Sequence, residues 1–235
     1  MSKNLCYICN SSNILEYKIL QCEFNHNYTL VQCVCGFIFI DPMPSINELS
    51  KYYNNLYNPH IKKNTLFKIF RHLVFFWKYK IIGNLFKNNL NNLITLDIGS
   101  GDGFFSKQMS LKKWNSFSYD SYIKKDLKYK NINNFNDSSL DLITLWHSIE
   151  HLHNLDYVMS KIKEKIKKNG YILIACPNIN SIDKNFFGSR WVAYDIPRHI
   201  YHFNPLTMKK MLLKYNLDIM KYYPMYQDTF FNVFL

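Results

Sequence analysis

The sequence predicts an α/β fold with a doubly wound, mostly parallel sheet. Buried-strand patterns alternate with helical patterns along residues 90–235, and a glycine-rich turn joins the first of these strands to a helix. Five of the six cysteines lie before Gly36, which predicts a small Cys-rich module at the amino end. We therefore expect a module over residues 1–44, a helical connector over 45–89 and an α/β domain over 90–235.

The composition is that of a globular chain with a basic surface. The 235 residues are 48% hydrophobic and 17% aromatic, which argues against disorder. Lys and Arg outnumber Asp and Glu by 29 to 17, but this charge is spread and accompanies no nucleic-acid recognition motif. We therefore expect no dedicated nucleic-acid surface. With no apolar leader and no window long enough for a bilayer, we expect a cytoplasmic protein.

Four cysteines near the amino end have the spacing of a metal site: Cys6, Cys9, Cys33 and Cys35. Four thiolates can bind one zinc ion tetrahedrally and leave no open position for chemistry, so we expect a structural zinc. The second pair is one residue shorter than the usual spacing, which keeps Cys22 and His26 open as substitute ligands. The alternative is that the thiols are reduced and pack as small hydrophobic groups.

The connector is predicted to contain two helices. Ser45 and Glu48 form a capping-box pattern at the start of the first. From Thr65 to Phe86 apolar residues recur every three or four positions, with Lys and Arg between them. A basic amphipathic helix can lie on a membrane or pack on a core, and we expect core packing here.

The glycine turn carries the chemistry. Residues 93–98 read as a buried strand that ends in Gly99-Ser100-Gly101-Asp102-Gly103, and a helical pattern follows. Glycines let the backbone approach a ligand closely, and a helix amino terminus offers free N–H groups. About 20 residues further on, a second strand ends in Asp120, where a carboxylate can accept hydrogen bonds from ribose hydroxyls.

A dinucleotide site would require a third glycine where this chain has Phe104. The acidic-x-Gly-x-Gly-x-Gly pattern instead resembles the first motif of the class I S-adenosylmethionine-dependent methyltransferases, and is made here by Asp97, Gly99, Gly101 and Gly103. This resemblance implies a Rossmann-like sheet and S-adenosyl-L-methionine as the cofactor. It also implies that the glycine turn faces the methionine end of the cofactor, that Asp120 holds the ribose and that Asp97 supports the turn.

Later segments resemble the same family. Residues 140–145 and the following His147-Ser148-Ile149-Glu150-His151 look like its fourth strand, and residues 171–178 like its fifth. Ligands of such sheets bind beyond the carboxyl ends of the strands. The expected cofactor-binding residues are therefore Asp97, Gly99, Ser100, Gly101, Gly103, Asp120 and His147.

Methyl transfer from a sulfonium mainly requires alignment and exclusion of water, with a general base where the acceptor is a hydroxyl. Our candidates for that base are His199 and His151, because histidine titrates near neutral pH. His199 follows Asp195 in an aromatic and basic loop, and the loop resembles that of a branch acting on sugars, nucleotide-sugars and small metabolites. The predicted acceptor atom is an oxygen, nitrogen or carbon of such a molecule.

The sheet edges are the weakest part of the pattern. Residues 132–135 offer only a short third strand, residues 217–223 a sixth, and residues 230–235 a short hairpin at most, so the carboxyl-terminal sheet edge is expected to be incomplete. Two alternatives stay open: a non-catalytic cofactor-binding protein on a methyltransferase scaffold, and a nicotinamide-dependent enzyme. The sequence does not indicate an oligomeric state.

Overall fold

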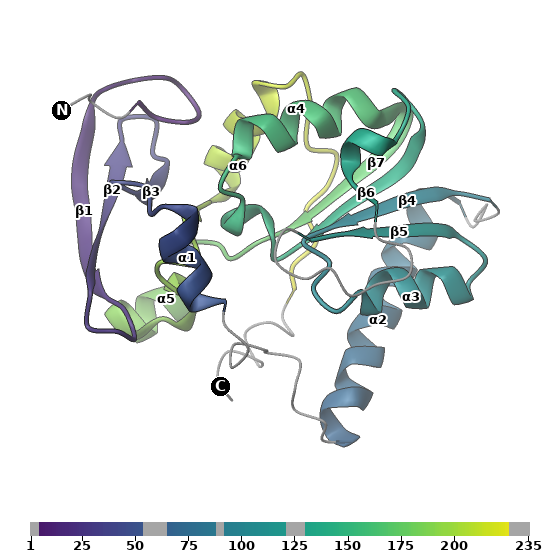
Figure 1. Ribbon diagram of the computed structural model, residues 1–235, viewed down its shortest axis with the longest axis horizontal. Helices are drawn as coiled ribbons and strands as arrows, with labels where there is room; N and C mark the ends of the chain where they lie inside the picture. Colours follow the sequence, from purple (N-terminus) through teal and green to yellow (C-terminus); the bar gives the residue numbers. More distant parts are fainter. Residues whose placement is uncertain (1–4, 54–64, 88–91, 121–129, 226–235) are drawn as a thin grey trace. The chain divides into compact units, whose positions relative to one another are not determined.

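The computed structural model describes residues 5–53, 65–87, 92–120 and 130–225 (Figure 1). The chain divides into two compact units. Unit 1 comprises Met1–Asn54, Ile149–Met159 and Cys176–Leu235, and unit 2 comprises Asn55–Ser148 and Ser160–Ala175. The cysteine-rich segment thus folds together with segments from the last third of the sequence. The three domain boundaries expected from the sequence stay a prediction.

Unit 2 contains a parallel sheet of four strands (Figure 1): β4 (Ile94–Ile98), β5 (Asn115–Tyr119), β6 (Leu140–Trp146) and β7 (Ile166–Ala175). Their order is β5-β4-β6-β7. From β4 the chain continues to one side through β5 and then returns to the other through β6, which is the doubly wound arrangement. The prediction of an α/β fold with a parallel sheet is confirmed.

The register places apolar residues of neighbouring strands side by side. Leu96 pairs with Phe117 on one side and with Ile143 on the other. Leu96 and Ile143 are fully buried. Strands covered on both faces read as continuous apolar runs, which is why these segments were recognisable in the sequence.

Two helices of unit 2 pack together on one side of this sheet, α2 (Thr65–Leu85) and α3 (Phe104–Leu111) (Figure 1). One apolar cluster joins α2, α3 and β6 through Phe75, Ile82, Phe105, Met109, Trp114 and Leu142. The basic helix therefore packs on a core, as expected. Among the described residues no helix is both long and apolar enough to cross a bilayer. The last helix before β7, α4, spans Leu155–Lys165.

Unit 1 contains an antiparallel sheet in the order β1-β2-β3-β8, formed by β1 (Ile14–Gln21), β2 (Asn27–Cys33), β3 (Ile38–Ile40) and β8 (Tyr201–His202). Its helices are α1 (Ile46–Tyr52), α5 (Ile182–Phe187) and α6 (Pro205–Leu213). The described residues also form four short 3-10 helices. One of them, η1 (Ile132–Asn134), lies in unit 2. The other three lie in unit 1: η2 (Ile149–His151), η3 (Gly188–Arg190) and η4 (Val192–Tyr194). The capping box predicted for α1 is confirmed, with Ser45 and Glu48 bonded reciprocally.

Much of the aromatic loop of residues 187–203 belongs to the core of unit 1. Trp191 and Tyr194 are buried in the same cluster as Leu30 and Ile40 of the sheet. Tyr201 stacks on the ring of Phe37, with 5.8 Å between centroids. The density of aromatic residues there is therefore explained largely by packing rather than by ligand stacking.

The third strand predicted over residues 132–135 is wrong. These residues form η1, because the Asn131 side chain caps the turn by accepting a hydrogen bond from the backbone N–H of Asn133 at 2.9 Å. Asparagine side chains compete with strand ladders in this way. Ile132 and Phe135 are buried all the same.

Two further boundaries differ from the sequence prediction. Residues 217–223 form no strand, and no side chain among them is fully buried. The strand expected over 171–178 is β7, which begins earlier and ends at Ala175. The hairpin considered for residues 230–235 lies outside the described residues.

The turn after β4 approaches β6 more closely than any side chain would allow. A Cβ atom added to Gly99 would lie 2.2 Å from the Cβ atom of Ser148, and φ at Gly99 is +71°. The Ser148 hydroxyl is itself fixed, because it donates to the Ile98 carbonyl at 2.7 Å. Glycine is therefore required at position 99 for two independent reasons.

We expect Gly99→Ala to lower the free energy of unfolding by roughly 3 kcal/mol or more, combining left-handed strain of about 1–2 kcal/mol with a backbone-level clash. The control is Gly36→Ala, where φ is +89° and the added Cβ would only touch the Thr207 methyl group at 3.8 Å. In that variant the free energy of unfolding should fall only by the cost of backbone strain. Urea denaturation of both variants measures the difference, and equal losses would contradict the close packing at Gly99.

Candidate functional site

The glycine turn has a backbone that only glycine adopts readily. The φ angles at Gly99, Gly101 and Gly103 are +71°, +57° and +72°. Gly103 is the N-cap of α3, and the N–H groups of Gly99 and Ser100 donate to the Tyr119 carbonyl at 2.8 and 3.2 Å. The turn is thereby anchored to the end of β5, at the carboxyl edge of the sheet. Ligands of doubly wound sheets bind at this edge, beside the point where the strand order reverses.

Asp120 lies against the same turn. It follows the last residue of β5, is 8% exposed, and its Oδ2 accepts a hydrogen bond from the Gly101 N–H at 2.9 Å. The predicted ribose-binding carboxylate and the predicted methionine-binding turn are thus adjacent. These residues fit S-adenosyl-L-methionine, because one ligand lying along the edge can contact both.

Asp97 is held from the neighbouring strand. The Thr144 hydroxyl of β6 donates to its Oδ1 at 2.6 Å, and Asp97 is 3% exposed. Burial raises the pKa of the Asp97 carboxyl to about 7, against the opposing effects of the Thr144 hydrogen bond and of Lys78. Asp97 therefore ties β4 to β6 directly beneath the turn, which is a supporting position.

An ion pair that the sequence analysis missed fixes the outside of the turn. Arg71 of α2 donates from both terminal nitrogens to the two carboxylate oxygens of Asp102, each at 2.8 Å. The same guanidinium lies 4.0 Å from the ring centroid of Phe104. The two residues are 31 positions apart, so no local spacing could have indicated the pair.

His147 directly follows the last residue of β6, at the same sheet edge. Its backbone is left-handed, with φ of +51°, and its N–H donates to the Ala175 carbonyl of β7 at 2.9 Å. The side chain is half-buried. Its predicted contact with the cofactor stays a prediction.

The two candidate bases lie together in unit 1. The rings of His151 and His199 meet edge to face with 4.5 Å between centroids. His199 Nε2 lies 4.0 Å from Oε1 of Glu150 and 3.6 Å from Oδ2 of Asp195. Burial, and secondly the neighbouring His199, lowers the pKa of His151 to about 4. His151 is therefore neutral at physiological pH and a weak base.

The segments carrying this cluster are joined through their backbones. The Ile200 N–H donates to the Glu150 carbonyl at 2.8 Å, and the His199 N–H donates to the Asp195 carbonyl at 2.9 Å. His202 is 3% exposed, and burial lowers its pKa to about 3.

The four predicted zinc ligands also come together. Cys6 Sγ lies 3.6 Å from Cys35 Sγ, and Cys9 Sγ lies 3.5 Å from Cys33 Sγ. All four sulfur atoms lie within 4.8 Å of one another. Cys22 is not in this group, since its sulfur lies 3.1 Å from the Tyr52 hydroxyl. The shorter second spacing is accommodated because Cys33 ends β2, and a turn with φ of +89° at Gly36 leads from it towards β3.

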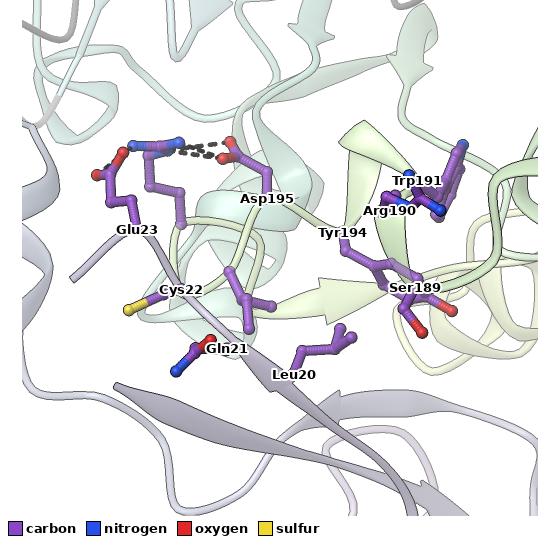
Figure 2. A pocket seen from close by; sticks show the side chains of 11 residues that line it. Leu20, Gln21, Cys22, Glu23, Ser189, Arg190, Trp191, Tyr194 and Asp195 are labelled. Atoms are coloured by element: carbon purple, nitrogen blue, oxygen red, sulfur yellow. Dashed lines mark hydrogen bonds and ion pairs between the residues drawn. The ribbon is translucent and has the colours of Figure 1, made fainter. Parts of the chain in front are cut away.

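Unit 1 has a small pocket beside the aromatic loop (Figure 2). Its volume is about 210 Å³, and its lining includes Ser189, Arg190, Tyr194, Asp195 and Arg198. The Arg198 guanidinium lies between two carboxylates, Asp195 and Glu23, as the dashed lines in Figure 2 show. Arg190 and Ser189 are exposed at this pocket.

The raised pKa of Asp97 predicts a pH dependence of stability. An unfolded aspartate titrates near pH ~4, so between about pH 4 and 7 the folded chain retains a proton that the unfolded chain releases. By linkage, this group makes the free energy of unfolding fall as the pH rises through that window. Asp97→Asn can still accept the Thr144 hydrogen bond but cannot titrate.

We therefore expect the unfolding free energy of the wild type to fall relative to that of Asp97→Asn between about pH 4.5 and 7.5. Denaturant titrations at several pH values, without cofactor, measure this difference. If the unfolding free energies of the two proteins changed with pH in the same way, Asp97 would be ionised throughout this pH range.

Comparison with known proteins assigns the chain to a family. Residues 70–222, more than half of the chain, match a family model described as a methyltransferase domain. No curated protein sequence matches the chain.

Solved structures of several methyltransferases are similar to this chain. A SAM-dependent methyltransferase from Archaeoglobus fulgidus is 23% identical over 62% of this chain and 68% of its own, with a TM-score of 0.49. Magnesium protoporphyrin IX methyltransferase from Synechocystis, with bound SAH, is 11% identical over 75% and 87%, with a TM-score of 0.48. Phosphoethanolamine N-methyltransferase 2 from Haemonchus contortus, in complex with S-adenosyl-L-methionine, is 19% identical over 53% of this chain and 33% of its own, with a TM-score of 0.37.

The family match begins within α2 and extends past α6, so it includes the glycine turn, Asp120 and both candidate histidines. The chain belongs to the methyltransferase-domain family, which confirms the prediction of an S-adenosylmethionine-dependent methyltransferase.

Proposed function

We propose that this chain transfers a methyl group from S-adenosyl-L-methionine to an oxygen, nitrogen or carbon atom of a sugar, nucleotide-sugar or other small metabolite. The observation that carries the proposal is the 2.9 Å hydrogen bond from Gly101 to Asp120, which brings the acid and the glycine turn to one edge of the sheet. Family membership supports methyl transfer, and the site supports the position of the cofactor.

S-adenosyl-L-methionine supplies a methyl group that is already activated by a positively charged sulfur. The protein therefore has to bind the cofactor and the acceptor, align them for methyl transfer and exclude water. We assign binding of the methionine end to the backbone of residues 99–103 and binding of the ribose to Asp120. Asp97 and the Arg71–Asp102 pair hold the turn in place from its two sides.

A hydroxyl acceptor requires a group that takes its proton. His199 fits this role better than His151, whose low pKa makes it a poor base at neutral pH. His199 Nδ1 donates to the Ala193 carbonyl at 2.8 Å, which leaves Nε2 as the basic atom. The pocket in Figure 2 supports a small polar acceptor, because its volume of about 210 Å³ suits one ring and it exposes Arg190.

One observation favours the alternative of a cofactor-binding protein without catalysis. The parallel sheet has four strands among the described residues, and neither residues 132–135 nor 217–223 add one. Incubation with labelled S-adenosyl-L-methionine and a panel of sugars, nucleotide-sugars and amines separates the two. Methylation of any acceptor excludes the alternative, and tight binding with no turnover on the panel favours it.

We expect Asp120→Asn to weaken binding of S-adenosyl-L-methionine by roughly 10- to 100-fold, the value of about 1.5–3 kcal/mol for hydrogen bonds to a charged group. The matched control is Asp141→Asn, which changes a carboxylate at the amino end of β6, where Asp141 accepts from Ile94 at 2.9 Å. That variant should bind the cofactor with unchanged affinity. Calorimetric titration measures both, and equal affinities in all three proteins would place the ribose elsewhere.

We also propose that Cys6, Cys9, Cys33 and Cys35 bind one structural zinc ion. The 3.5 and 3.6 Å sulfur separations support this, since Zn–S bonds of about 2.3 Å in a tetrahedron place the sulfur atoms about 3.8 Å apart. Such a site contributes to folding and has no open position for an acceptor.

Cobalt substitution tests the zinc proposal, because only thiolate ligands give an intense sulfur-to-cobalt charge-transfer band. We expect the full band in the wild type and in Cys22→Ala. Cys33→Ala, which keeps three thiolates, should give a weaker band and at least a tenfold weaker metal affinity. A band of wild-type intensity and affinity in Cys33→Ala, or a weakened band in Cys22→Ala, would reject the assigned ligand set.

A further inference from the structure

We propose that unit 1 contains a second metal site, in which Glu150, His151 and His199 bind one divalent transition-metal ion. The carboxylate of Glu150 and one ring nitrogen of each histidine all lie within 4.8 Å of one another. This site is separate from the four cysteines and does not depend on the proposed methyl transfer.

Distances in the cluster are close to those that an ion requires. Two ligands with bonds of about 2.1 Å lie about 3.0 Å apart at a right angle and about 3.4 Å apart in a tetrahedron. His199 Nε2 is 4.0 Å from the Glu150 carboxylate. A side-chain movement of less than about 1 Å therefore brings these two atoms to coordinating distance.

Hydrogen bonds on the far side of both rings orient them for coordination. His199 Nδ1 lies 2.8 Å from the Ala193 carbonyl, and His151 Nδ1 lies 2.9 Å from the Arg198 carbonyl. A carbonyl oxygen only accepts, so Nδ1 of His199 carries the proton and its Nε2 has the lone pair. Nδ1 of His151 lies 2.9 Å from both the Arg198 carbonyl and the Tyr53 hydroxyl. A backbone carbonyl behind the ring is the usual second partner of a metal-binding histidine.

Burial of the cluster favours a cation bound beside the Glu150 carboxylate. Glu150 is 1% exposed and His199 is 9% exposed, whereas His151 is half-buried. A metal cation among these side chains would stabilise an ionised carboxylate at this depth.

The ligand set indicates which ions fit. Two imidazoles and one carboxylate suit Mn²⁺, Fe²⁺, Co²⁺, Ni²⁺ or Zn²⁺ rather than the all-oxygen ions Mg²⁺ and Ca²⁺. Three protein ligands also leave positions for water or for an oxygen of a small molecule. Coordination would use the same Nε2 lone pair that a general base needs, so the metal site and the His199 base are alternative roles.

A Mn²⁺ titration of the full chain tests the proposal, because Mn²⁺ prefers oxygen and nitrogen ligands and is bound poorly by the four thiolates. The chain is first loaded with one equivalent of Zn²⁺, which four thiolates bind in preference to a site of two histidines and a carboxylate, and free Mn²⁺ is then followed by electron paramagnetic resonance. We expect one bound ion per chain in the wild type. Glu150→Gln and His151→Asn should each weaken binding at least tenfold.

The control is Glu48→Gln, the same change at the capping position of α1, which should bind Mn²⁺ as the wild type does. Circular dichroism verifies that each variant is folded. His151→Asn should perturb packing least, because His151 is only half-buried. Absence of Mn²⁺ binding by the folded wild type at millimolar concentration would overturn the proposal. Wild-type affinity in folded Glu150→Gln or His151→Asn would overturn it as well.

Discussion

The left-handed backbone between β4 and α3 is the constraint on which the cofactor site depends. Three alternate residues of the turn, Gly99, Gly101 and Gly103, have positive φ angles. This conformation directs the Gly101 N–H to Asp120 and lets the backbone approach Ser148. Side chains at these positions would strain the turn, and at Gly99 a side chain would also clash with Ser148. The proposed cofactor site therefore depends on glycine at these positions.

The surrounding contacts hold this turn from several directions. Asp97 connects it to β6 through Thr144, and Asp102 connects it to α2 through Arg71. Burial of Asp97 would be unfavourable for an ionised carboxylate without such partners, and its raised pKa expresses that cost. A site held in this way is organised before the ligand arrives, so less binding energy is lost in ordering it.

Sequence alone predicted the parts of the fold that have a strong local pattern. Buried strands such as β4 and β6, the capping box of α1 and the helix after Gly103 were all recognisable from apolar runs, caps and turns. Residues 132–135 were misjudged because local hydrogen bonding by Asn131 outweighed a weak strand pattern. In the loop of residues 187–203, the sequence alone does not show which aromatic residues belong to the core and which to the surface.

The candidate sites were predictable to different degrees. The proposed zinc ligands form two pairs, each close together in the sequence, and the glycine turn follows a known spacing. The pairing of Glu150 with His199 and that of Arg71 with Asp102 depend on how distant segments fold together. Such contacts carry no signal in one sequence, because the spacing between the partners is set by the whole fold rather than by one element.

A crystal structure of the protein with S-adenosylhomocysteine, the demethylated form of the proposed cofactor, tests the assigned cofactor site. We expect ribose hydroxyls within hydrogen-bonding distance of the Asp120 carboxylate and the amino acid end of the ligand against residues 99–103. A ligand bound at a different edge of the sheet, or a turn whose conformation excludes it, would contradict the assignment of the cofactor site.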